Sequence, residues 1–348
     1  MPLAFLLLPI LGPALAIDRD GAHLRAESAA IVDLFYGHDF DRAAPAADAL
    51  AKRHPGHPVG PLFQAIVAYQ RWLAEGMLEN AAWDAIDVKL SSAVAAAQAL
   101  EASAPAESHY YRGAALGFRA RGLAGKRHFI RALPDAAASV RQLRMALDLD
   151  PTLQDARLGL GMYHYFAARM PRAAKPLASM LVGEPPDREK GLAELWEVAR
   201  STGIARMEAR AVLAMILSKE DEANWNGAEE LLKELMSRYP RNPLYRLRRV
   251  YVSERRGEWS QAQSLADPEG AWLRGLHPSL QDNARIWARY RLAEIYILEG
   301  RSSDARNLLL SIDETKAPKN LRPWIRRRRA EASSGLKNRD VAPYFSGY

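Results

Sequence analysis

Side chains that could do chemistry are few in this chain and stand apart from one another. The loop HPGHP places His54 and His57 three residues apart between prolines, a spacing that could start a metal site. Zinc needs further ligands, and no nearby Asp, Glu or His in the sequence completes the set. Glu220, Asp221 and Glu222 form an acidic turn, but a calcium cage needs more carboxylates than these three. We therefore expect no metal and no cofactor.

The stretch GLGMYHYFAARMP at 159–171 has small residues like those of a phosphate-binding loop. It follows no predicted strand and lacks the third glycine and the downstream acidic residue of such loops. Glycines here are more typical of helices that approach closely. His164, between two tyrosines, is a lone histidine, which favours a packed or hydrogen-bonded side chain over a general base.

Sequence motifs of common enzymes are also missing. The chain has no HExxH, no GxSxG, no phosphate loop with lysine and no cysteine at all. The sequence therefore offers no positive case for catalysis, and we expect no catalytic residue.

Residues 282–312 show the element that organises the chain. The first half carries apolar residues at helical spacing and ends at Gly300, and the second half restarts with Ala305, Leu309 and Ile312 on one face. This pattern predicts a hairpin of two amphipathic helices. One hairpin cannot bury both apolar stripes, so the pattern must recur if the protein is to have a core.

The pattern of the second helix recurs seven times: a small residue, apolar residues four and usually seven positions later, and often a proline twelve positions later. The small residues are Ala43, Ala93, Ser139, Gly191, Ala228, Ala262 and Ala305. The prolines are Pro55, Pro105, Pro151 and Pro240. Proline cannot continue a helix, so these positions mark helix ends.

This arrangement resembles the tetratricopeptide repeat, over roughly residues 22–335. The resemblance implies an all-α fold, an α-solenoid of about seven degenerate helical hairpins. The middle of the chain is also similar to uncharacterised exported bacterial repeat proteins. Only Ala228 to Ala262 shows the 34-residue period of the family, and the extra residues fall mainly at 123–138, 170–186 and 267–281. We expect loops or added helices there.

A concave groove lined by the first helix of each hairpin is a further implication of the resemblance. The third hairpin begins at Ser108, and we expect its first helix to end at Gly122. One face of that helix carries three candidate groove residues, and the equivalent positions of the final hairpin carry three more. The six candidate residues are His109, Arg112, Arg119, Trp287, Tyr290 and Glu294. Exposed Arg, Trp and Tyr often anchor interfaces. The alternative is that these side chains pack against the next repeat.

Composition supports an all-helical chain. Apolar residues make up 49% of the 348 residues, and no alternating β-branched run is present. We predict a helical solenoid over 17–336, whose last helix starts near Pro323, is ended by Gly335 and caps the stack, and a loosely held tail at 337–348.

The first seventeen residues carry no charged side chain and include an apolar run from Leu3 to Leu11. They predict a secretory signal, residues 1–16, cleaved after Ala16, although the usual charged start is missing. The alternatives are an uncleaved membrane anchor and a buried amino-terminal helix. A signal peptide implies export, so we expect the protein in the periplasm or associated with the cell envelope.

The net charge is +7, mostly from arginine, with runs at 246–256 and 326–329. Four consecutive arginines on a helix point to all sides and cannot form one stripe. We interpret the charge as solvated surface; the alternative is attraction to an acidic protein or an anionic membrane, and we expect no nucleic-acid partner.

Together these observations predict an exported scaffold that binds protein or peptide partners in a bacterial cell envelope. One alternative is an envelope enzyme or small-ligand-binding protein with its site in the 123–186 insertions. Another is peripheral binding to anionic membrane through the basic carboxy-terminal half. The sequence leaves the oligomeric state open.

Overall fold

The computed structural model describes residues 21–75, 80–170, 172, 175–318 and 321–334. Every regular element in these ranges is a helix, which confirms the all-α prediction. The predicted signal at 1–16 and the predicted tail at 337–348 lie outside the described residues.

The chain forms two compact units, divided between Leu213 and Ala214 within helix α10 (Arg206–Leu217). The amino-terminal unit precedes this division and the carboxy-terminal unit follows it, except that residues 74–76 group with the latter. A single continuous solenoid over 17–336 stays a prediction.

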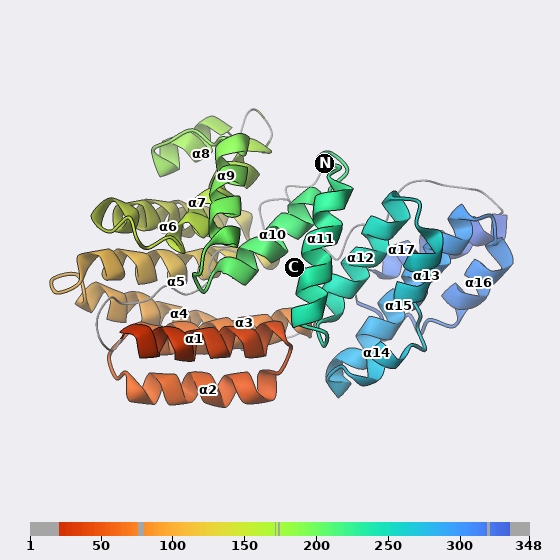
Figure 1. The fold of residues 1–348 in the computed structure, drawn as a ribbon, viewed down its shortest axis with the longest axis horizontal. Coiled ribbons are helices and arrows are strands. Elements are labelled where there is room, and N and C mark those ends of the chain that lie inside the picture. Colours follow the sequence, from red (N-terminus) through yellow and green to blue (C-terminus); the bar gives the residue numbers. More distant parts are fainter. Residues whose placement is uncertain (1–20, 76–79, 171, 173–174, 319–320, 335–348) are drawn as a thin grey trace. The chain divides into compact units, whose positions relative to one another are not determined.

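Nine helices of the described chain precede α10 (Figure 1). They are α1 (Gly21–Tyr36), α2 (Phe40–Arg53), α3 (Val59–Ala74), α4 (Asn80–Ala99), α5 (Pro105–Gly125), α6 (Phe129–Leu149), α7 (Ala156–Ala168), α8 (Lys175–Val182) and α9 (Arg188–Arg200). Helices that follow one another in the sequence pack together: α1 with α2, α4 with α5, α5 with α6, and α6 with α7, while α7 packs with α9 across the short α8.

The carboxy-terminal unit continues the same plan. Its helices are α11 (Trp225–Arg238), α12 (Pro243–Arg255), α13 (Trp259–Leu265), α14 (Ala271–Arg274), α15 (Pro278–Leu298), α16 (Ser302–Leu310) and α17 (Arg322–Ser334). α12 packs with α11 and α13, α15 with α16, and α16 with α17. This sequential packing confirms the repeat-type architecture, and α17 is the predicted capping helix.

The small residues that define the predicted repeats all lie in the core. Ala43, Ala93, Ser139, Ala228, Ala262 and Ala305 are fully buried, and Gly191 is buried as well. A Cβ atom on Gly191 would lie 2.4 Å from the backbone nitrogen of Tyr165 and 2.7 Å from the carbonyl oxygen of Gly161. Gly161 therefore serves the close contact between α7 and α9, as the sequence indicated.

Four hairpins turn in the same way. The turn residue has a left-handed backbone, and the next N–H donates to the carbonyl five residues earlier, which is the Schellman arrangement. The turn residues are His38, Arg127, Gly257 and Gly300, with φ of 57°, 63°, 73° and 80°. The bonds are Asp39 to Leu34, His128 to Leu123, Glu258 to Ser253 and Arg301 to Tyr296, with N···O distances of 2.8 to 2.9 Å.

The prediction that Gly122 ends a helix is wrong, because α5 continues to Gly125. Gly122 faces the neighbouring α4, where a Cβ would lie only 1.7 Å from the Trp83 ring. The glycine is thus required by packing and does not stop the helix. The extra residues at 123–138 lengthen both α5 and α6, whereas those at 170–186 include α8 and those at 267–281 include α14.

Candidate functional site

Four of the six predicted groove residues are buried. His109, Trp287, Tyr290 and Glu294 expose at most 5% of their surface. The imidazole Nδ1 of His109 lies 2.8 Å from Oε1 of Gln142 on α6, so this nitrogen donates to the amide oxygen. The prediction that these four side chains line an open groove is wrong: the alternative, packing against neighbouring helices, describes them.

The other two predicted residues, both on α5, are partly exposed and ion-paired. Arg112 donates to Glu101 at 3.1 Å. Arg119 makes a bidentate pair with Asp135, with N···O distances of 2.6 and 2.7 Å, and this pairing raises the pKa of its guanidinium. α5 therefore brings His109, Arg112 and Arg119 together as a row. Whether either trio binds a partner stays a prediction.

Tyr290 and Glu294 of the α15 trio belong to a larger buried cluster, centred on Glu294. Its carboxylate accepts hydrogen bonds from the Tyr290 hydroxyl at 3.0 Å and from Arg291 at 2.7 Å. Arg328 of α17 donates to the same carboxylate at 3.0 and 3.2 Å and also binds Glu331. We call these five residues, together with Glu254, the polar ladder.

The ladder extends to α12 through Glu254, Tyr251 and Arg248. Burial raises the pKa of Glu254, and the positive charge of Arg291 opposes that rise. The Tyr251 ring lies beneath the guanidinium of Arg291, 5.4 Å from it. The pKa of Arg248 is lowered to about 10, mainly by burial and to a lesser extent by repulsion from Arg291.

Arg248 and Arg291 each stand nine residues before the glycine that turns their hairpin, so they are the same position in two repeats. Positive and negative groups alternate along the ladder from α12 through α15 to α17. The ladder thus links the first helices of successive repeats by charge.

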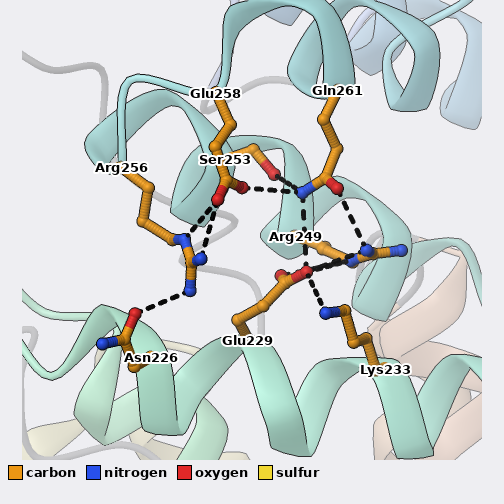
Figure 2. A network of polar contacts seen from close by, with 8 residues as sticks. All are labelled: Asn226, Glu229, Lys233, Arg249, Ser253, Arg256, Glu258 and Gln261. Atoms are coloured by element: carbon orange, nitrogen blue, oxygen red, sulfur yellow. Dashed lines mark hydrogen bonds and ion pairs between the residues drawn. The ribbon is translucent and has the colours of Figure 1, made fainter.

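A second network joins α11, α12 and α13 around the buried Glu229 (Figure 2). Arg249 donates to Glu229 through two nitrogens, at 2.8 and 2.9 Å. Gln261 bridges to the Ser253 hydroxyl at 2.7 Å and to Glu258 at 2.9 Å. All its members lie in one repeat and its neighbouring helix, which indicates a structural role.

His164 in α7 is fully buried between two carboxylates. Its Nδ1 lies 2.7 Å from Glu194 of α9 and its Nε2 lies 3.0 Å from Glu184, in the segment before α9. Arg144 of α6 pairs with the same Glu184 carboxylate at 2.5 Å. Burial alone would raise the pKa of Glu184, but the charges of His164 and Arg144 lower it. The sequence predicted a hydrogen-bonded His164, and the structure confirms it.

Two buried acids that the sequence did not single out lie near α10 in the amino-terminal unit. Glu208 is 3.7 Å from Arg121, whose guanidinium covers the Tyr69 ring, and burial raises the pKa of Glu208 to about 8. Asp155 accepts the N–H groups of Ile204 and Ala205 at 3.2 Å, just ahead of α10; burial raises its pKa to about 6, although these bonds lower it. Their partners are tens of residues away, so no local motif marks them.

The two loop histidines have separate polar contacts. The Val59 N–H donates to Nδ1 of His57 at 3.2 Å, so Nε2 carries the proton and donates to Glu107 at 2.9 Å. His54 lies 3.5 Å from Glu27. Over the described ranges, no three His, Cys, Asp or Glu residues are grouped so that they could hold a metal ion.

Many arginines bind the carbonyl groups left free at helix ends. Arg246 donates to Leu265 at 2.9 Å, Arg289 to Ser311 at 3.1 Å, and Arg329 to Leu309 at 2.8 Å and Ile312 at 2.9 Å. These carbonyls belong to the carboxyl ends of α13 and α16 or to the residues that follow.

The run 326–329 forms no single stripe, as predicted. Arg326 and Arg329 bind Glu314, Arg327 binds Glu331, and Arg328 lies in the polar ladder. No helix in the described part of the chain is long and apolar enough to cross a membrane.

Comparison with known proteins finds similarity to solved structures only. No protein-family model and no curated protein matches this chain. The chain is similar to a tetratricopeptide repeat protein from Parabacteroides merdae, with 13% identity over 90% of this chain and 100% of that one, at a TM-score of 0.37. The repeat architecture is therefore evident from the hairpins and turns of this chain alone.

Proposed function

We propose that the protein is a helical-repeat scaffold that binds protein or peptide partners and carries out no catalysis. The observation that supports this is the sequential packing of two-helix hairpins that share one turn geometry. Two of these hairpins also carry an arginine nine residues before the turn glycine, at Arg248 and Arg291. Stacked repeats create extended surfaces, which such proteins use for binding. We propose export to the periplasm or cell envelope as well; the apolar residues 1–17 alone support this.

The surface that we assign to a partner is the α5 row, because only there are predicted residues partly exposed. Arg112 keeps 21% of its side-chain surface exposed while it pairs with Glu101, whose side chain is half exposed. A carboxylate of a partner could replace Glu101 without disturbing the core. Trp287, Tyr290 and Glu294 are buried, so we leave them out of the proposed surface.

Partner capture tests this assignment. The full chain, Arg112→Glu and Glu101→Gln would each be crosslinked in envelope extracts, and the captured proteins identified. We expect Arg112→Glu to lose partners, because the pairing charge is reversed, while Glu101→Gln keeps or gains them, because Arg112 is released. Equal partner profiles for all three proteins, at unchanged melting temperature, would reject the α5 row.

A thermal-shift screen with metabolites separates the scaffold from an enzyme or ligand-binding protein with its site at 123–186. A ligand that binds the folded state raises the melting temperature. We expect no specific shift; a specific one would favour the ligand-binding alternative.

A further inference from the structure

The hairpin of α5 and α6 is longer than the other hairpins with the same turn. In the hairpins that turn at Gly257 and Gly300, the buried small residue follows five positions after the turn. Ser139, the buried residue that contacts the Gly113 carbonyl of α5, follows twelve positions after Arg127. The seven additional residues extend the hairpin by roughly two helical turns, or about 10 Å at 1.5 Å per residue.

The tip of this extension, residues 126–131, combines basic side chains with an exposed apolar one. Ile130 exposes 85% of its surface, more than any other large hydrophobic residue in the described ranges. The side chains of Arg127, His128 and Arg131 form no hydrogen bond or ion pair with the described residues. Lys126 lies 6.0 Å over the Trp83 ring. In a protein whose arginines are mostly ion-paired or bound to carbonyls, this tip is an exception.

The backbone at the tip is strained. Arg127 adopts φ of +63°, the conformation that glycine provides at Gly257 and Gly300 and that His38 adopts in the hairpin of α1 and α2. A side chain there costs roughly 1 kcal/mol relative to glycine.

We propose that the tip, residues 126–131, docks on an anionic phospholipid surface, with Ile130 entering the headgroup region and Lys126, Arg127 and Arg131 binding lipid phosphates. A bilayer accepts a single protruding apolar side chain surrounded by cations. A protein partner would need a far larger contact, on the order of 800 Å² per side. This surface lies in the amino-terminal unit, whereas the arginines at 326–329 in the carboxy-terminal half are held by internal contacts.

Flotation with vesicles of phosphatidylcholine, with and without phosphatidylglycerol, tests the proposal on the full chain. We expect binding only to the anionic vesicles, weakened by salt. Arg127→Glu should weaken it by more than about tenfold and Ile130→Ser by about fivefold, from the usual contributions of a cation and a partly inserted side chain. Lys52→Glu, an exposed site on α2 of the same unit, is the matched control and should retain binding. The apolar residues 3–11 are common to all variants, so their contribution cancels.

Arg127→Gly separates binding from folding. It should raise the melting temperature, because glycine takes the left-handed backbone without strain, and still lower vesicle affinity by about fivefold through the lost charge. A merely structural residue would not change the two quantities in opposite directions.

The absence of cysteine permits a direct measurement of insertion. An environment-sensitive fluorophore on Ile130→Cys should shift to the blue and be quenched by spin-labelled lipid, whereas the same dye on Val88→Cys, exposed on α4, should not. A dye at position 130 that stays in water on anionic vesicles would overturn the proposal. So would capture of an acidic protein through 126–131 without any lipid response.

Discussion

Removing Arg328 from the polar ladder should loosen the last repeat. The guanidinium is almost fully buried and donates to Glu294 and Glu331, so Arg328→Met leaves these carboxylates without their shared cation. Breaking a buried pair from one side usually costs about 3–5 kcal/mol. We expect about 3 kcal/mol, the lower end of that range, because Arg291 still holds Glu294.

Hydrogen exchange of the full chain, resolved by peptide, is the appropriate assay, because two compact units need not unfold in one step. Amides of α15 and α17 should lose protection in Arg328→Met. Arg326→Met is the matched control on the same helix: its guanidinium is exposed and pairs with Glu314, so exchange should hardly change.

A double-mutant cycle with Glu294→Gln then isolates the pair. We expect a coupling on the order of 1–3 kcal/mol, since both groups share one network. Equal exchange for Arg328→Met and Arg326→Met, or no coupling to Glu294→Gln, would refute the view that the ladder holds α17 in place.

Further predictions concern the amino-terminal unit. Gly191→Ala should destabilise it by roughly 1–3 kcal/mol in denaturant unfolding, because the new Cβ meets backbone atoms that cannot move aside; Gly56→Ala, where no atom lies within 4 Å, reports the backbone effect of a left-handed glycine alone. Glu208 has a pKa raised from 4.5 to about 8, so the folded state binds the extra proton and stability falls as pH rises across this interval; Glu208→Gln should flatten that slope, and an unchanged slope would contradict it. Glu184→Gln should increase hydrogen exchange in the segment before α9, since His164 and Arg144 both hold this carboxylate.

Much of the fold could be predicted because it is encoded locally. Helical spacing, prolines after second helices and the small residues such as Ala262 and Ala305 each report contacts within one hairpin. The end of α5 could not be predicted from Gly122, because the same residue type ends helices and permits close packing. Only the position of Trp83, some forty residues earlier, decides between the two.

The candidate site was harder to predict for a similar reason. Residue spacing predicts which side chains share a helix face, and His109, Arg112 and Arg119 do form a row on α5. The solvent exposure of these side chains could not be predicted in the same way, because it depends on which helices from elsewhere in the chain pack over them. Glu294 is buried by the approach of Arg328, which is 34 residues away. Burial also gives Glu208 and Asp155 their raised pKa values, and nothing in their local sequence signals it.

The arginines at helix ends limit how the chain can vary. Arg329 uses two of its nitrogens to reach Leu309 and a further contact to reach Ile312, which a lysine, with one ammonium on a flexible stem, cannot copy. A substitution that keeps the charge would thus lose the joint between α16 and α17. Homologues should therefore retain arginine at such joints, while lysines on their surfaces vary. Engineered variants in which lysine replaces these arginines should lose the contacts between helix ends before other parts of the fold are affected.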